Sequence, residues 1–285
     1  MSSPYTSPYK IVIAGNIVEA FQYAHPIGYQ LEADKRQRPH HKRRAPELQE
    51  ISPSSLSRTR HRIIRTINAN CHTWLDWEQR PMRPQFITYT FKENITSLSE
   101  ANPLFTNYIK RLNYHEFASK KSVVKYITVP EFQKRGAVHY HTVFFNLRPI
   151  NQRHEFKTGE FASFWEHGHI KVKKIAGVPN VGNYMTKYMT KDATDRRLVG
   201  RKKYFATRGL IQPTIITHER LARDMNDYLS TLSPLHAYIS KPKEDSLYPI
   251  DNPTFCATYH LHPEELRTLK NFYSLDSYES ISLLS

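Results

Sequence analysis

Two segments rich in β-branched and aromatic residues, 123–132 and 137–147, are separated by only four residues, Gln133 to Gly136. A connection of that length cannot hold a crossover helix, so the two segments can pair only as an antiparallel hairpin. The further elements expected around it are strands at 85–91 and 169–175, and helices at 100–118, at 158–167 and from Asn183 onward. The order strand, helix, strand, strand, helix, strand, helix predicts an α+β fold in which a central antiparallel sheet is flanked by helices.

The two ends of the chain are less clearly patterned. Residues 9–30 are typical of a hairpin that turns at Gly15-Asn16, and residues 55–78 carry apolar side chains at helical spacing. The stretch 32–62 is strongly basic and interrupted by prolines, which suits an exposed linker and a DNA-tracking arm equally well. The expected division of the chain is an N-terminal hairpin, basic segment and helix, partly integrated with the core, at 1–80, a core at 81–212, and a small helical appendage of unknown role at 213–285.

Charge and composition narrow the classes of function. The 285 residues include 41 Lys and Arg against 26 Asp and Glu, a formal net charge of +15. This surplus favours a polyanionic partner, nucleic acid first, because cations that neutralise phosphates release bound counterions. The two cysteines, Cys71 and Cys256, match no disulfide framework or zinc spacing. The sequence has no apolar run as long as a membrane span and no signal-peptide pattern, so a cytoplasmic location is expected.

His139 and His141 lie two residues apart in a segment expected to be a strand. Side chains alternate across a strand, so the two imidazoles share one face and Tyr140 lies on the other. Two neighbouring imidazoles can ligate one divalent metal ion. A second pair, His167 and His169, spans a glycine at an apparent turn and is interpreted as surface histidines. Chance alone yields roughly one such pair in this composition, so the strand around the first pair is what makes it a candidate.

Glu131 is the candidate third ligand. It ends the strand that precedes the histidine strand, and in an antiparallel hairpin that end lies beside the start of the next strand. A carboxylate there completes a two-histidine, one-carboxylate site with open positions for substrate oxygens. The alternative is a solvated glutamate near a turn, since a register shift of one residue would place the side chain on the other face.

The helix expected near Asn183, a suitable N-cap, combines phenols with ammonium groups. The residues at positions i, i+3, i+4 and i+7, on one helix face, are Tyr184, Lys187, Tyr188 and Lys191. A phenol can act as a nucleophile toward a phosphodiester, and a nearby lysine offsets phosphate charge and favours the phenolate. Half-buried tyrosines with lysines that extend past them to solvent would give the same pattern. The helix alone therefore leaves catalysis and packing equally open.

Three segments stand in the order of the three motifs of HUH-superfamily endonucleases: FITYTF at 86–91, EFQKRGAVHYH at 131–141 and NVGNYMTKYMTKD at 180–192. The chain resembles this superfamily, and most closely the rolling-circle replication initiators (Rep proteins) of small phages and plasmids. The segment RKKYFATRGL at 201–210 also resembles a stretch that follows the tyrosine helix in such proteins. The resemblance covers about residues 86–212, and its specificity comes from three short patterns occurring together and in order.

The resemblance implies an RRM-like antiparallel sheet and a metal-dependent DNA endonuclease. His139, His141 and Glu131 would be the ligands of a Mg²⁺ or Mn²⁺ ion. A tyrosine would attack single-stranded DNA at a replication origin, forming a 5′-phosphotyrosine link and a free 3′-OH that primes synthesis, and a second transfer would rejoin the strand. Tyr188 is the expected nucleophile, because its surroundings look more like those of one-tyrosine plasmid initiators. Tyr184 would be a second nucleophile or a packed companion.

The resemblance also implies partners. The sequence has no GxxxxGK(S/T) phosphate-binding loop, so a separate host or phage helicase is expected to unwind the DNA, in the cytoplasm of a bacterial host cell. Basic grooves track the backbone of single strands. The candidate backbone contacts, each equally well a solvated surface charge, are Lys134, Arg135, Lys171, Lys173, Lys174, Arg201 and Lys202.

Two other functions stay open at this point. The same chemistry serves single-strand DNA transposases and plasmid relaxases, although relaxases typically present a histidine triad rather than one glutamate and two histidines. A non-catalytic, RRM-like nucleic-acid-binding module would account for the charge and the aromatic residues. It would not account for an acidic residue and two histidines on adjacent strands.

Overall fold

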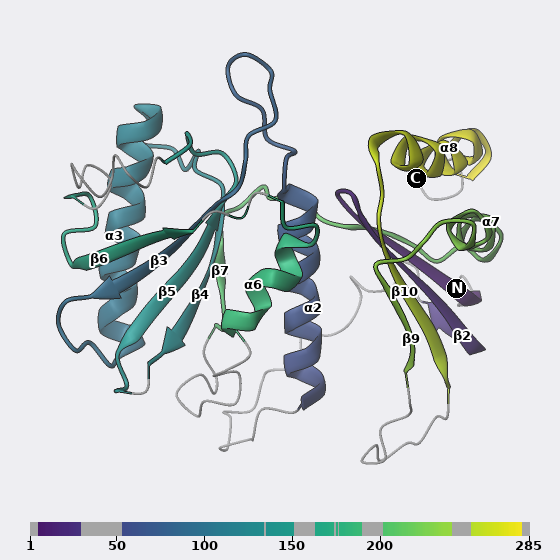
Figure 1. Ribbon diagram of the computed structural model, residues 1–285, viewed down its shortest axis with the longest axis horizontal. Coiled ribbons are helices and arrows are strands. Elements are labelled where there is room, and N and C mark those ends of the chain that lie inside the picture. The colour runs from purple at the N-terminus through teal and green to yellow at the C-terminus, as the bar shows by residue number, and fades with distance from the viewer. Residues whose placement is uncertain are drawn as a thin grey trace. The chain divides into compact units, whose positions relative to one another are not determined.

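The computed structural model describes residues 5–29, 53–133, 135–150, 163–173, 175, 177–189, 202–240 and 252–280 (Figure 1). For 53–56, 187–189 and 273–280 it describes the backbone alone. The chain divides into two compact units. We call Ala45–Gln212 the central unit, and Met1–Arg44 together with Pro213–Ser285 the terminal unit.

The central unit is built on a sheet with the strand order β6-β3-β5-β4-β7, in which each neighbouring pair is antiparallel. Its strands are β3 (Gln85–Phe91), β4 (Tyr126–Phe132), β5 (Val138–Phe144), β6 (Gly168–Lys173) and β7 (Phe205–Ala206). Its helices are α2 (Pro53–Asn70), α3 (Leu98–Phe117) and α6 (Val181–Met189). The expected α+β fold, with an antiparallel sheet flanked by helices, is confirmed for this part of the chain.

One face of this sheet packs against α3 and holds an aromatic core (Figure 1). Phe105 of α3 stacks on Tyr140 of β5, with ring centroids 4.4 Å apart, and the hydroxyls of Tyr89 and Tyr108 are hydrogen-bonded at 2.7 Å. Trp165 is fully buried there and donates from Nε1 to a backbone carbonyl of β3. Burial of each such ring contributes about 1.5–3 kcal/mol. Tyr140 therefore belongs to the core, on the side away from its two neighbouring histidines, as expected.

The opposite face of the sheet carries α2 and α6 (Figure 1). The buried side chains that join these helices to β3, β4 and β5 are Ile63, Ile67, Val181, Met185, Phe86, Ile127 and Val143. Helix α2 ends earlier than the expected 55–78, because His72 adopts a left-handed φ of 59° that a continuing helix cannot accommodate. Of the helix expected at 158–167, residues 158–162 lie outside the described ranges, and 164–167 form a turn and bend.

The terminal unit has its own antiparallel sheet, in the order β8-β1-β2-β10-β9. Its strands are β1 (Tyr5–Ala14), β2 (Ile17–Tyr29), β8 (Thr214–Ile216), β9 (His236–Ser240) and β10 (Thr254–His260), and its helices are α7 (Glu219–Ser230) and α8 (Pro263–Ser280). Side chains of both helices pack with those of the sheet in one core. The turn expected at Gly15-Asn16 joins β1 to β2, and Gly15 takes the positive φ of 65° that such a tight turn requires.

The structure groups the chain ends differently from the expected division. The N-terminal hairpin belongs to the terminal unit, where β8 pairs with β1 and β10 pairs with β2, whereas α2 belongs to the central unit. Residues 213–285 contribute three strands as well as helices, so they are not the small helical appendage expected. The physical reason is that a lone hairpin is marginally stable and exposes two unpaired edges, which strands from the far end of the chain cover here. None of the helices in the described ranges is long and apolar enough to cross a membrane.

Candidate functional site

The β4–β5 hairpin places Glu131 directly opposite His139, and His141 opposite both Val129 of β4 and Thr88 of β3. Directly opposed residues of antiparallel strands lie on the same side of the sheet. Glu131, His139 and His141 therefore share one side, which we call the histidine face. It is the side that carries α2 and α6, because Phe86 and Val143, which alternate in step with Thr88 and His141, pack against these helices.

His141 is held from two sides. It is 5% exposed, its Nε2 contacts Oε2 of Glu131 directly, and its Nδ1 is hydrogen-bonded to Oγ1 of Thr88 at 3.1 Å. The ring of Phe86 lies beside the imidazole, with centroids 5.9 Å apart. A hydroxyl bonded to one ring nitrogen fixes the orientation of the other, which is the arrangement that metal-binding histidines usually have.

His139 is buried but its Nε2 has no hydrogen-bond partner among the described residues. The pKa of His139 is lowered to about 4, first by burial and then by the nearby charges of His141 and Arg135, while Glu131 opposes them. The imidazole is therefore neutral at physiological pH and keeps a lone pair for a ligand. A buried polar atom left without a partner costs free energy, so it calls for an explanation such as a bound ion.

The three side chains fit a metal in their chemistry rather than in their present spacing. Two imidazole nitrogens and a carboxylate are donors that divalent transition metals accept, and the unpartnered Nε2 of His139 is available to one. In the ranges that the structure describes, no three His, Cys, Asp or Glu side chains are gathered closely enough to hold an ion. Glu131 and His141 are instead engaged with each other.

Helix α6 begins at Val181, and its N-cap is Asn180, not the expected Asn183. Oδ1 of Asn180 accepts a hydrogen bond from the backbone N–H of Asn183 at 2.8 Å, which satisfies one of the free donors at the helix start. Asn68 of α2 links the two helices, because its Nδ2 donates to Oδ1 of Asn180 and its Oδ1 accepts from the backbone N–H of Gly182 at 2.8 Å. These bonds set the position of the tyrosine helix against α2.

Gly182→Ala is expected to destabilise the protein by about 1–3 kcal/mol, because there is no room for a methyl group between α6 and α2. A Cβ at this position would lie 2.3 Å from the carbonyl oxygen of Ile64 and 2.9 Å from Oδ1 of Asn68. Chemical unfolding measures the change, with Gly28→Ala as control, since a Cβ there meets nothing within 4 Å. Equal stability of the two variants would contradict the close approach of the helices.

Tyr184 of α6 lies on the histidine face. It is half-buried and packs with the cluster that contains Phe86 and Val143. Lys173 of β6 donates from Nζ to the Tyr184 hydroxyl at 3.3 Å, and the same ammonium lies 5.8 Å from the centroid of the ring. A cation at a phenol oxygen favours the phenolate over the neutral form. The fold thus brings a phenol, a lysine and the paired histidines to one side of one sheet.

Residues 84–193 match the family model of the replication-associated proteins of the ORF2 type. The matched segment runs from just before β3 to beyond the end of α6, so it contains Glu131, both histidines of the pair and both tyrosines. This similarity supports a replication protein with a role in initiation. A search of curated proteins and a search of solved structures found no match.

Several expected site residues of this replication-associated segment and its flank cannot be placed with their side chains. Tyr188 and Lys187 belong to the backbone of α6, one turn and three residues after Tyr184, and their side chains lie outside the described part of the structure. The expected residues that lie wholly outside the described ranges are Lys134, Lys174, Lys191 and Arg201.

The remaining basic candidates are placed. Lys171 is exposed on β6 directly opposite Thr88, so it lies on the histidine face with Lys173. Arg135 is exposed in the β4–β5 turn and donates from Nε to Gln133 at 3.0 Å. Lys202 is exposed beside β7. The structure therefore brings two of the seven candidates, both on β6, to the site.

Two residues with a structural part in the site were missed from the sequence. Thr88 lies in the FITYTF segment, and strand alternation could have placed it on a face with Phe86, but only the β3–β5 pairing puts it beside His141. Asn68 carries no sequence signal for its contacts, because it reaches α6 only through the packing of two helices that are far apart in the chain.

Proposed function

We propose that the central unit cuts and rejoins single-stranded DNA at a replication origin through a tyrosine of α6, and so starts and ends rolling-circle replication. The observation that carries this proposal is the shared histidine face: Glu131, His139 and His141 lie on the same side of the sheet as α6 and Tyr184. The match of residues 84–193 to a replication-associated family supports the same biological role.

Glu131, His139 and His141 would hold a divalent ion, Mg²⁺ or Mn²⁺. Such an ion polarises the scissile phosphate and stabilises the negative charge of the departing oxygen. Thr88 keeps the ring of His141 oriented through its Nδ1, so that Nε2 faces Glu131. Burial keeps His139 neutral, the protonation state in which an imidazole can bind a cation.

The phenol oxygen attacks phosphorus, and the bond from phosphorus to the 3′ oxygen breaks. The phosphate remains on the tyrosine as a 5′-phosphotyrosine, and the proton lost by the phenol is balanced by the one that the 3′-OH gains. One phosphodiester replaces another, so the reverse transfer, which rejoins the strand, is available without an external energy source. Lys173, which donates to the Tyr184 hydroxyl, stabilises negative charge on the phenol side of the reaction.

The chain supplies cations for a DNA strand on this face. Lys171 and Lys173 alternate along β6 and lie beside Thr88 and Phe86, and the whole chain carries a net charge of +15. Phosphate contacts of this kind position a strand without reading its sequence. Unwinding of the duplex would fall to a separate host or phage helicase.

The test is incubation of the full chain with labelled single-stranded oligonucleotides from the neighbouring genome and Mn²⁺, followed by a denaturing gel. A labelled band that migrates with the protein and disappears with chelator supports the proposal. Binding without any cleavage or adduct across the oligonucleotide set, at saturating Mn²⁺, would favour a non-catalytic module instead.

Thr88→Val is expected to weaken Mn²⁺-dependent nicking about 10-fold, because hydrogen-bond partners of metal-binding histidines contribute 10–100-fold to affinity or activity. Valine keeps the size and β-branching of threonine and removes the hydroxyl that bonds Nδ1 of His141. Nicking rates across a Mn²⁺ titration measure the change. Thr90→Val is the control, since Thr90 lies on the same strand and face, opposite His139. Identical titrations for the two variants would show that the Thr88 hydroxyl has no part in the site.

A further inference from the structure

A pocket of about 530 Å³ opens at the edge of the central sheet, beside β3 and β6. Its volume falls within the range of about 300–1,000 Å³ that is typical of small-molecule sites. Apolar side chains and cationic groups line it together, and no Asp or Glu is among the described residues of its wall. The lining residues on which the argument rests are Arg83, His72, Lys173, Ile150, Val172 and Val178.

The pocket concentrates positive charge. Arg83 is close enough to His72 for its charge to lower the pKa of the imidazole, although burial is the larger cause. Lys173 adds a third cationic group to the same lining. Cations gathered around a concave surface without carboxylates favour an anionic ligand. The apolar part of the lining, which includes Val172 and Val178, favours a ligand that also has a flat or apolar portion.

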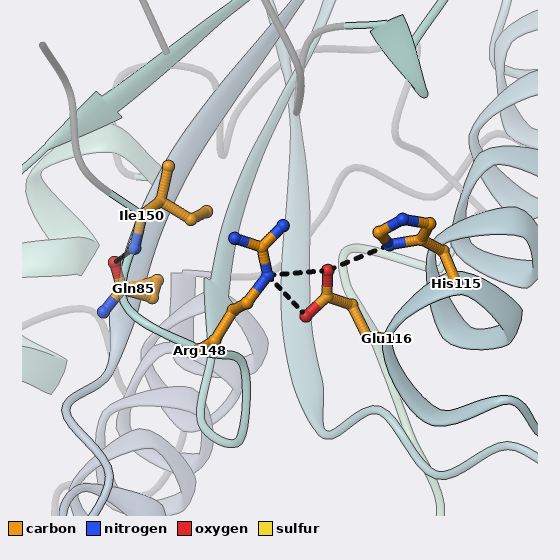
Figure 2. A network of polar contacts seen from close by, with 5 residues as sticks. All are labelled: Gln85, His115, Glu116, Arg148 and Ile150. Carbon is orange, nitrogen blue, oxygen red and sulfur yellow. Dashed lines mark hydrogen bonds and ion pairs between the residues drawn. The ribbon is translucent and has the colours of Figure 1, made fainter. Parts of the chain in front are cut away.

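The walls of the pocket are held in place before any ligand arrives. Gln85 spans them, because its Oε1 accepts from the backbone N–H of Ile150 at 3.4 Å and its Nε2 donates to the carbonyl of Arg83 at 3.1 Å. Figure 2 shows the neighbouring anchor: Nε of Arg148 donates to both carboxylate oxygens of Glu116 on α3, at 3.2 Å each. The segment from Arg148 to Ile150 is thus tied at both ends. A site with fixed walls loses little conformational entropy on binding.

Lys173 connects this pocket to the tyrosine. The ammonium that lines the pocket is the one that donates to the Tyr184 hydroxyl. A phosphate bound by Lys173 would therefore lie between the pocket and the phenol. A nucleotide is the ligand whose chemistry combines an anionic phosphate with a flat, largely apolar base.

We propose that this pocket receives one nucleotide of the single-stranded DNA that the enzyme cuts, with the base against Ile150 and Val178 and the phosphate toward Arg83 and Lys173. The inference rests on the proposed function for the identity of the strand. It makes the pocket a place where the sequence beside the cleaved phosphate is selected.

The first test measures binding of the full chain to fluorescein-labelled oligo(dT) by anisotropy, with chelator present. Arg83→Ala should weaken binding about 10-fold, the size of one charge-assisted hydrogen bond, and Arg83→Lys should recover most of that loss. Arg223→Ala, which removes an exposed arginine of α7, is the matched control and should bind like the wild type. Equal affinities of Arg83→Ala and Arg223→Ala would overturn the proposal.

The second test asks whether a base enters the pocket. The wild type should bind oligo(dT) more tightly than an abasic strand of the same length, and Val178→Trp, which fills the pocket without changing charge, should reduce this preference at least about 3-fold. Thermal unfolding of each variant checks that it folds. An unchanged base preference in a folded Val178→Trp protein would exclude a base from the pocket. If thymidine monophosphate binds as tightly as oligo(dT), the pocket serves a free nucleotide rather than the DNA strand.

These measurements need neither a metal ion nor a reactive tyrosine. Loss of affinity in Arg83→Ala together with a failed adduct assay would keep the pocket and reject the nicking chemistry. An intact adduct with no effect of Arg83→Ala or Val178→Trp would keep the chemistry and reject the pocket.

Discussion

His139→Leu is expected to lower Mn²⁺-dependent nicking at least ~100-fold, while the folded protein stays as stable as the wild type, or becomes more stable, when metal is absent. The side chain is 7% exposed and its Nε2 has no partner among the described residues. A buried donor or acceptor without a partner costs about 1–3 kcal/mol, and leucine removes that cost without leaving a large cavity. A residue kept at such a cost is typical of a functional site rather than of a core.

His141→Ala should behave differently, because it breaks the contact with Glu131 and the hydrogen bond with Thr88. We expect it to lose both nicking and stability. The contrast between the two histidines separates a ligand role from a structural role. His139 should show the loss of activity alone.

Thermal unfolding with and without Mn²⁺ gives a readout that does not depend on activity. An ion that binds only the folded protein raises the melting temperature, and His139→Leu should lose that shift. His169→Ala, which removes an exposed imidazole from β6, is the control and should keep both the shift and the nicking. A wild-type Mn²⁺ shift in His139→Leu, or full nicking with it, would remove His139 from the metal site.

The local parts of the site could be predicted from the sequence because short-range geometry determines them. A four-residue connection required the β4–β5 hairpin, and the strand period of two placed His139 and His141 on one face with Tyr140 on the other. The position of Glu131 opposite His139 followed from the hairpin alone. The helix start was displaced by one turn, because Asn180 and Asn183 are both good N-caps and only the packing on α2 selects between them.

The long-range parts could not be predicted, because they depend on which surfaces meet. Strands β8, β9 and β10 contain β-branched and aromatic residues, yet nothing in the sequence says that β10 pairs with β2. The contact of Lys173 with Tyr184 joins a strand to a helix and requires the sheet order β6-β3-β5 to be known. A basic residue becomes part of a site only when the fold brings it there, so charge alone did not separate Lys173 from Arg135.

Tyr188→Phe is expected to abolish the covalent protein–DNA adduct, a fall of at least ~1,000-fold, and to leave DNA binding nearly unchanged. The substitution removes only the oxygen that would attack phosphorus. Tyr188 follows Tyr184 by one helical turn, so the two residues stand at neighbouring positions of the α6 backbone. The Tyr184 hydroxyl is already bonded by Lys173 and its ring is packed against the central core, which suits a supporting part or a second transfer.

Tyr184→Phe is the matched comparison, because it takes a hydroxyl from the same helix and breaks the bond from Lys173. A single tyrosine can cut a strand and reseal it, but it cannot cut a second site while it still carries the first phosphate. If both tyrosines act, Tyr184→Phe should form the first adduct and fail in the second transfer, which a strand-exchange assay with two labelled oligonucleotides measures. An adduct that persists in Tyr188→Phe and is lost in Tyr184→Phe would reverse the assignment. Loss of the adduct in neither variant would place the nucleophile outside α6.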